Sequence, residues 1–199
     1  MSSSPAQRII IVGSSNSGKS TLGQRLATRM NVPFIELDAL YWQPGWVEPE
    51  IDEFRERVRR AIHGDSWVLV GNYSLQVDIS WPLADMVIWL DLPLLIALRR
   101  CIVRSWRRYR SQELLWGTNR EKFWEHLMLW NPKKSLISYT IVRHRARRRW
   151  YEEQMRDARW SHIVFVRLTS VEEIEQWVAA LPYLAARQRL GHVPCGRLG

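Results

Sequence analysis

The chain has 199 residues, of which 29 are lysine or arginine and 20 are aspartate or glutamate, so its formal net charge is +9. This length suits one α/β domain with an insertion and does not suit two separate cores. The sequence has no secretory signal pattern and no apolar run long enough to span a bilayer, which predicts a cytoplasmic protein without a membrane partner. Cys101 and Cys195 are too far apart in the sequence for a zinc motif.

The positive charge is concentrated in one segment. Residues 99–149 contain 15 basic and 3 acidic residues, a balance of +12, whereas the rest of the chain has a balance of −3. Such a segment is typical of solvated helix faces, of an arginine-lined cover over polyphosphate, or of a nucleic-acid surface. The sequence leaves these three interpretations open.

Strand and helix signals alternate in the first half of the chain, which is typical of a parallel sheet with helices on both faces. A turn is expected at Pro44 and Gly45. The apolar patterns predict strands at 8–12, 34–37 and 67–70, and helices at 19–30 and 49–63.

The second half continues the alternation and contains the basic segment. We expect strands at 86–90 and 162–168, and helices at 93–110, 119–130 and 132–158. Residues 111–120 are expected to form a loop. The last helix should start with a capping box at Ser170 and end before Pro182. The sequence thus predicts one domain over 1–182, with a lid insertion at about 107–149 and a loosely ordered tail at 183–199.

A phosphate-binding motif follows the first predicted strand. The segment Gly13-Ser14-Ser15-Asn16-Ser17-Gly18-Lys19-Ser20 has the G-x-x-x-x-G-K-[ST] pattern of a Walker A loop. In such loops backbone N–H groups surround the phosphates of ATP, the lysine contacts the β- and γ-phosphates, and the next hydroxyl contacts Mg²⁺. A chance turn rich in glycine and serine is the alternative, but the flanking strand and amphipathic helix favour the phosphate loop. The predicted nucleotide contacts are Gly13, Ser15, Asn16, Ser17, Gly18, Lys19, Ser20 and Thr21.

The order of these elements resembles that of the small nucleoside-monophosphate-kinase group of P-loop proteins. Leu37-Asp38 with Pro44-Gly45-Trp46, and the block 67–73 ending in Gly-Asn-Tyr, are similar to its adenylate-kinase-like branch often labelled DNA topology modulation protein. The resemblance covers about residues 8–181. It implies a three-layer α/β P-loop NTPase fold with a parallel sheet and an arginine-rich helical lid, and it implies ATP and Mg²⁺ as cofactors.

Two acidic residues follow predicted strands, where open α/β sheets bind their ligands. In shikimate-kinase-like relatives an acid at the position of Asp38 contacts Mg²⁺ or the acceptor hydroxyl, so the resemblance implies that Asp38 orients or deprotonates the acceptor. Asp91 resembles a Walker B acid after the strand at 86–90. The alternatives are a turn or helix cap for Asp38 and a helix cap for Asp91.

Two arginines match an adenylate-kinase pattern that is counted from the first proline of a helix. Counting from Pro93 gives Arg100 and Arg104, which implies contacts to adenine and phosphates; surface arginines without a role are the alternative. One position departs from the family pattern, because Val70 stands where relatives carry an aspartate. Mg²⁺ would then be held by Ser20, with help from Asp38 or Asp91.

The sequence therefore predicts an ATP-dependent phosphotransferase that acts on a small-molecule, nucleoside or nucleotide acceptor. The expected catalytic residues are Lys19, Asp38 and Arg104, and the expected Mg²⁺ ligands are Ser20, Asp38 and Asp91. A P-loop nucleotide hydrolase and an ATP-modulated nucleic-acid-binding protein are the alternatives, and the oligomeric state is left open.

Overall fold

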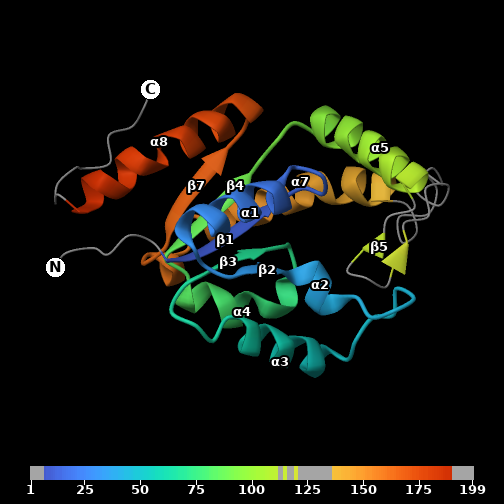
Figure 1. The fold of residues 1–199 in the computed structure, drawn as a ribbon, viewed down its shortest axis with the longest axis horizontal. Helices are drawn as coiled ribbons and strands as arrows, with labels where there is room; N and C mark the ends of the chain where they lie inside the picture. Colours follow the sequence, from blue (N-terminus) through green and yellow to red (C-terminus); the bar gives the residue numbers. More distant parts are fainter. Residues whose placement is uncertain (1–6, 112–113, 116–118, 121–135, 190–199) are drawn as a thin grey trace.

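The computed structural model describes residues 7–111, 114–115, 119–120 and 136–189. Its central feature is a five-stranded, fully parallel sheet of order β2-β3-β1-β4-β7 (Figure 1). The strands are β1 (Arg8–Gly13), β2 (Phe34–Glu36), β3 (Trp67–Val70), β4 (Met86–Leu90) and β7 (Val164–Leu168). The parallel sheet predicted from the alternating signals is confirmed.

Helices cover both faces of this sheet, and Figure 1 shows α3 and α4 on the side opposite α8. The longer helices are α1 (Lys19–Met30), α3 (Ile51–Ala61), α5 (Leu94–Ser111), α7 (Leu136–Gln154) and α8 (Val171–Arg189). The shorter ones are α2 (Leu37–Tyr41), α4 (Val77–Ser80), η1 (Ser74–Gln76), η2 (Trp81–Leu83) and η3 (Ala158–Trp160). None of the helices in the described ranges combines the length and hydropathy that a membrane span requires.

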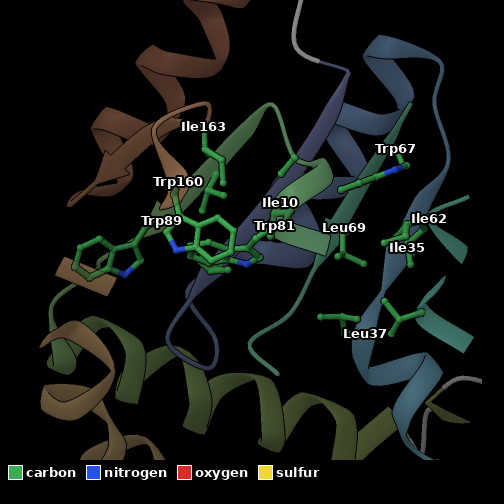
Figure 2. Packing of buried hydrophobic residues seen from close by; sticks show 14 of the residues in the cluster. Ile10, Ile35, Leu37, Ile62, Trp67, Leu69, Trp81, Trp89, Trp160 and Ile163 are labelled. Atoms are coloured by element: carbon green, nitrogen blue, oxygen red, sulfur yellow. The ribbon is translucent and has the colours of Figure 1, made fainter. Parts of the chain in front are cut away.

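Alternate residues of the central strands pack on opposite faces, because side chains along a strand point up and down in turn. Ile10 of β1 belongs to a buried cluster that also includes Phe54 of α3 and Tyr151 of α7. Figure 2 shows Ile10 with Trp81, Trp89 and Trp160 of this cluster. Its neighbour Ile11 belongs to a second cluster with Leu22 of α1 and Ile174 of α8. The two clusters and the sheet between them give the three layers of the fold.

Several predicted boundaries differ from those of the structure. β2 ends at Glu36, and residues 37–41 form α2 where the sequence predicted the strand to continue to Leu37. α7 begins at Leu136 and ends at Gln154, inside the predicted range of 132–158. Residues 114–115 (β5) and 119–120 (β6) form an antiparallel pair where the sequence predicted a loop and the start of a helix. The remainder of that predicted helix, 121–135, lies outside the described residues.

The predicted end of the last helix is also wrong, because α8 continues through Pro182 to Arg189. A proline inside a helix cannot donate a hydrogen bond to the carbonyl four residues earlier, which here belongs to Val178. Arg29 of α1 supplies the missing donor, with Nη1 lying 3.1 Å from the Val178 oxygen. The backbone of 183–189, predicted to be tail, therefore extends α8, and residues 190–199 lie outside the described part.

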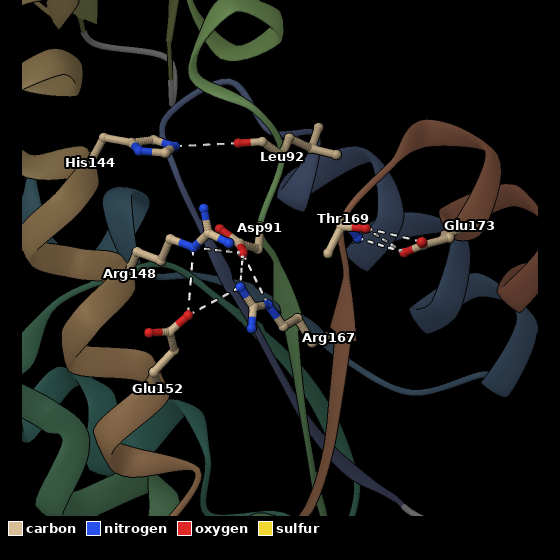
Figure 3. A network of polar contacts seen from close by, with 8 residues as sticks. All are labelled: Asp91, Leu92, His144, Arg148, Glu152, Arg167, Thr169 and Glu173. Carbon is tan, nitrogen blue, oxygen red and sulfur yellow. Dashed lines mark hydrogen bonds and ion pairs between the residues drawn. The ribbon is translucent and has the colours of Figure 1, made fainter. Parts of the chain in front are cut away.

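The start of α8 follows the predicted capping box. Ser170 Oγ accepts a hydrogen bond from Glu173 N at 3.0 Å. A Glu173 carboxylate oxygen accepts one from Thr169 N at 2.6 Å, as Figure 3 shows. These bonds satisfy N–H groups that the first turn of a helix otherwise leaves without partners. The prediction of a cap at Ser170 is confirmed.

Candidate active site

The loop between β1 and α1 has the tight backbone that its glycines and asparagine allow. Gly13, Asn16 and Gly18 have φ values of 147°, 64° and 97°. A Cβ added at Gly13 would lie 2.5 Å from the carbonyl oxygen of Leu90 on the neighbouring strand, so no other residue fits there. Residues 13–20 thus form a compact turn that leads into the N-terminus of α1, as a phosphate loop requires.

Polar side chains in this loop lack hydrogen-bond partners. Ser14 Oγ, Ser17 Oγ and both amide atoms of Asn16 are buried and make no hydrogen bond within the described part of the chain. Buried polar atoms without partners cost free energy, and a cluster of them beside a helix N-terminus is the environment that an anionic ligand relieves. The loop therefore fits the phosphates of a nucleotide.

The Gly71-Asn72-Tyr73 motif holds the start of the phosphate loop. Asn72 Nδ2 donates to the Gly13 oxygen at 2.5 Å, and Asn72 Oδ1 accepts from the Gly13 nitrogen at 3.0 Å. The same Oδ1 accepts from the Tyr151 hydroxyl of α7 at 3.1 Å. Asn72 therefore connects the end of β3, the phosphate loop and α7.

Lys19 lies in surroundings that oppose its charge. Its Nζ donates to the Ser14 oxygen at 2.8 Å. Burial is the main cause that lowers the pKa of Lys19 from 10.5 to about 7. Among the neighbouring charges, Arg147 and Arg104 lower this pKa further, while Asp38 and Glu36 raise it. Asp38, Arg104 and Arg147 therefore lie within electrostatic range of Lys19, and the catalytic roles of Lys19, Asp38 and Arg104 stay predictions.

Ser20 pairs with an acid that the sequence analysis did not select. The Ser20 hydroxyl donates to Glu36 Oε1 at 2.5 Å. Glu36 is the last residue of β2 and is the register partner of Val70 on β3. Glu36 therefore places a carboxylate on the strand next to Val70, beside the hydroxyl predicted to contact Mg²⁺.

Asp38 lies on α2 and faces Tyr73. The Tyr73 hydroxyl donates to Asp38 Oδ1 at 2.7 Å, whereas Asp38 Oδ2 makes no hydrogen bond with the described residues. The carboxylate is near enough to Lys19 to raise the pKa of that lysine. Asp38 is thus half-buried, held on one oxygen and placed beside the phosphate loop.

Arginines from two helices approach the loop. Arg100 Nη1 of α5 donates to the Ser17 oxygen at 3.0 Å. Arg104, one turn further along α5, and Arg147 of α7 contribute to the positive field around Lys19. Of the predicted pair, Arg100 therefore contacts the loop, while Arg104 and Arg147 add positive charge near Lys19.

Asp91 takes part in a separate ion-pair network (Figure 3). Its Oδ2 accepts from Nε and Nη2 of Arg167 at 2.9 and 2.5 Å and lies 3.3 Å from Arg148 Nε. Glu152 Oε1 accepts from Arg167 Nη2 at 3.2 Å. The Asp91 side chain is only 5% exposed. The structure therefore places Asp91 among basic side chains of α7 and β7 and out of contact with Ser20, and a role in Mg²⁺ binding stays a prediction.

Comparisons with known proteins agree with this architecture. The chain is 36% identical over 67 residues to a shikimate kinase from Xanthomonas campestris pv. campestris strain 8004, which covers 30% of this chain and 37% of that protein. The chain thus matches just over a third of the length of this relative. No family model matches.

Two solved structures resemble the whole chain. Shikimate kinase from Aquifex aeolicus has a TM-score of 0.52 and 16% identity, covering 93% of this chain and 99% of that one. Shikimate kinase from Acinetobacter baumannii, in complex with shikimate, has a TM-score of 0.52 and 14% identity, covering 93% and 96%. This chain has the three-layer α/β P-loop NTPase fold. At such identities the likeness establishes the fold alone.

Three residues of this site were not predicted individually from the sequence. The sequence pattern favours Asp38, which follows the predicted strand, over Glu36 inside it, although an acid as the last residue of a parallel strand is itself a signal. Asn72 was read only as part of a family motif. Arg147 was one of many basic residues in a segment where sequence alone offers no ranking.

Proposed function

We propose that this P-loop NTPase is an ATP-dependent phosphotransferase that acts on a hydroxyl group of a small molecule. The observation that carries the proposal is the placement of the Asp38 carboxylate beside Lys19 at the phosphate loop, with Asp38 Oδ2 open to a further partner. A phosphate loop alone supports nucleotide binding, whereas an adjacent, partly solvated carboxylate is what an acceptor hydroxyl requires.

The residues present fit ATP and Mg²⁺. The unpaired polar atoms of the loop, Lys19, Arg100 and Arg104 offer donors and positive charge to the phosphates. The Ser20 hydroxyl and the Glu36 carboxylate are hard oxygen ligands, and they are the pair we assign to Mg²⁺. Bound Mg²⁺·ATP would supply a polarised γ-phosphoryl group and neutralise part of its charge.

Asp38 is the residue we assign to the acceptor. The Tyr73 hydroxyl fixes Oδ1 at 2.7 Å, which limits rotation of the carboxylate and directs Oδ2 as an acceptor for a substrate hydroxyl. Asp38 Oδ2 would take the proton of that hydroxyl as its oxygen forms a bond to the γ-phosphorus, while the bond from this phosphorus to the bridging oxygen breaks and ADP leaves. Lys19 and the arginines would hold the transferring group in line.

The arginines near Lys19 also bear on how the basic segment of residues 99–149 is interpreted. Arg104 and Arg147 lie close enough to Lys19 to affect its charge, which supports the basic segment as a cover over polyphosphate rather than a nucleic-acid surface. The finer resemblance to the branch labelled DNA topology modulation protein rests on the Leu37-Asp38 and Gly71-Asn72-Tyr73 motifs. Use of ATP as the phosphoryl donor would suit a cytoplasmic enzyme.

Stabilisation by nucleotide tests whether the protein binds ATP, which is the first part of the proposal. A ligand that binds only the folded state raises the free energy of unfolding by RT ln(1 + [L]/Kd), about 2.7 kcal/mol at a hundredfold excess over Kd. We expect ATP or ADP to raise the melting temperature and Lys19→Ala to remove this effect. Unchanged melting with every nucleoside triphosphate would contradict the proposal.

The Asp38→Asn variant tests whether Asp38 takes the proton of the acceptor hydroxyl, which is the second part of the proposal. We expect an ATP affinity within a few-fold of the wild type and a phosphoryl-transfer rate lowered by about a hundredfold or more, because the amide cannot accept the proton. Tyr73→Phe is the matched control: it keeps the carboxylate and removes only the hydrogen bond to Oδ1, so its loss should be smaller. Wild-type transfer by Asp38→Asn would leave Asp38 with a structural role.

A further inference from the structure

The side chain of Asn72 extends the pairing of β1 and β3 beyond the ends of the strands. A backbone bond from Gly71 N to the Ile11 oxygen, at 3.2 Å, lies at the end of this pairing. One step further on, Asn72 Oδ1 accepts from Gly13 N at 3.0 Å and Asn72 Nδ2 donates to the Gly13 oxygen at 2.5 Å. A side-chain amide can make both bonds because it carries a donor and an acceptor. The peptide units on both sides of Gly13 are therefore held where the phosphate loop leaves the sheet.

The same amide is a hydrogen-bond partner of α7. Asn72 Oδ1 has a second lone pair, and the oxygen also accepts from the Tyr151 hydroxyl at 3.1 Å. Tyr151 is 4% exposed, and the centroid of its ring lies 5.4 Å from that of Trp89 on β4. Packing holds the ring in place, so the bond made by its hydroxyl fixes the rotation of α7 relative to the start of the phosphate loop.

Helix geometry places Arg147 on the same side of α7 as Tyr151. Residues four apart lie one above the other on a helix, so Arg147 lies one turn from Tyr151. Figure 3 shows the adjacent row of α7 side chains, which contacts the network of Asp91. Arg147 is near enough to Lys19 to lower the pKa of that lysine. A change in the rotation of α7 would therefore move Arg147 relative to the phosphate loop.

The residues on either side of Asn72 connect it to the acceptor side of the site. Gly71 has φ 148°, and a Cβ added there would lie 2.6 Å from the Leu37 Cβ, so the end of β3 passes directly against the start of α2. Tyr73 donates to Asp38 of α2 at 2.7 Å. Three consecutive residues, 71–73, therefore contact the segment of the proposed acceptor residue, the phosphate loop and α7.

We infer that Asn72 and Tyr151 are positioning residues for phosphoryl transfer: Asn72 fixes the phosphate loop, and the bond from Tyr151 to Asn72 orients α7 so that Arg147 faces the γ-phosphate. The inference rests on the proposed phosphotransferase function. Asn72 acts through the backbone of the loop, and Tyr151 acts through the Arg147 guanidinium. A cation held at the transferring group acts most strongly in the transition state. Loss of the Tyr151 hydroxyl therefore lowers the rate of transfer and leaves nucleotide affinity unchanged.

The Tyr151→Phe variant tests this because it keeps the ring and removes only the hydroxyl. ADP formation from Mg²⁺·ATP would be followed in water and with glycerol and the four ribonucleosides as acceptors, and the Kd of ADP would be measured by calorimetry. We expect kcat to fall by about tenfold and the Kd of ADP to stay within about twofold. Asn72→Ala, which also releases the loop, should lower kcat and raise the Kd of ADP by about tenfold. Wild-type kcat in Tyr151→Phe would overturn the inference.

A double-mutant cycle separates positioning from a loss of stability. Arg147→Met should lower kcat, and in that background Tyr151→Phe should lower it further by less than about twofold, because the side chain that Tyr151 positions is gone. Arg149→Met is the matched control, since it removes the same charge from an exposed position of α7 on the opposite side of the helix. In the Arg149→Met background Tyr151→Phe should keep its full effect. Equal effects in the two backgrounds would assign the Tyr151 hydroxyl a structural role and overturn the inference.

The same measurements report separately on the proposed function. Failure of both ADP and ATP to bind the wild-type protein would contradict the proposed function, and the inference with it. ATP hydrolysis that none of the acceptors accelerates would count against the phosphotransferase. The cycle measured on hydrolysis would then still decide the role of Tyr151, because water attacks the same γ-phosphorus.

Discussion

Lys19 illustrates at the residue scale how the surroundings of a side chain oppose the charge that a polyphosphate ligand needs. Burial and two nearby arginines lower its pKa from 10.5 to about 7. Between these two values the unfolded chain binds more protons than the folded protein, so Lys19 makes the free energy of unfolding rise with pH in this window. Below about pH 7 Lys19 is charged in both states and its buried charge destabilises the fold. A polyphosphate in the loop would favour the charged form again.

Proton uptake on ATP binding is the consequence that can be measured. At pH 8 to 9 the lysine of the free protein is mostly neutral, and binding of Mg²⁺·ATP should be accompanied by uptake approaching one proton. Calorimetry in two buffers of different ionisation enthalpy reports this number. Lys19→Met should show no such uptake, and the rise of the free energy of unfolding between pH 7 and 9 should be smaller in this variant. Equal uptake in both proteins would assign the proton to another group.

Glu36 gives the second residue-scale prediction. Because its carboxylate accepts from the Ser20 hydroxyl, Glu36→Gln removes the negative charge next to the assigned Mg²⁺ position while keeping side-chain size. We expect the Mg²⁺ concentration needed for half-maximal phosphoryl transfer to rise by about tenfold or more. Glu48→Gln, a change at an exposed acid of the same region, is the control. An unchanged Mg²⁺ dependence in Glu36→Gln would remove Glu36 from the metal site.

At the scale of elements, α7 is held at its C-terminal half. Tyr151 joins the buried core and hydrogen-bonds Asn72, and Arg148 and Glu152 share the network of Asp91 and Arg167. Arg147, adjacent in sequence to Arg148, contributes to the field at Lys19. The network thus orients the helix that brings a cation to the phosphate loop.

The Asp91→Asn variant tests how much this ion-pair network contributes to the free energy of unfolding. The substitution leaves two guanidinium groups beside a neutral amide at a position where the carboxylate is only 5% exposed. We expect the free energy of unfolding to fall by about 1–3 kcal/mol in urea titrations. Glu175→Gln, which breaks the exposed pair with Arg25, should cost much less because solvent screens that pair. Similar costs in the two variants would mean that the Asp91 network contributes no more than a surface pair.

At the scale of the whole molecule, we expect the basic segment to close over the nucleotide. Cations gathered on α5 and α7 repel one another until a polyphosphate supplies counter-charge. The C-terminal part of α7 packs on the core, so any movement belongs to the remainder of the predicted lid at about 107–149. Closure would also exclude water that competes with the acceptor.

Hydrogen exchange with and without an ATP analogue tests this lid. We expect residues 150–154 to be protected in both states, and residues 107–147 to gain protection when the analogue binds. Arg100 and Arg104 should change less, because this part of α5 contacts the body through the Ser17 carbonyl and the buried Cys101. Equal protection of 107–147 in both states would identify the segment as a fixed platform.

Local sequence determined much of the fold of this protein. β-Branched runs such as Ile9–Val12 favour strands, the glycines of the phosphate loop permit a backbone that other residues cannot adopt, and Ser170 caps the helix that follows it. These features depend on a residue and its near neighbours, so they could be predicted from the chain. The nucleotide loop and the parallel sheet followed directly from them.

Only the tertiary structure decided which distant side chains meet. Glu36 reaches Ser20 because β2 lies next to β3, Asn72 reaches Gly13 because β3 lies next to β1, and Asp91 meets Arg167 because β4 pairs with β7. Strand order and helix rotation arise from packing of both sheet faces over long sequence separations, which no local pattern encodes. The same holds for Pro182 of α8, which the helix tolerates because Arg29 of another helix supplies a donor to Val178.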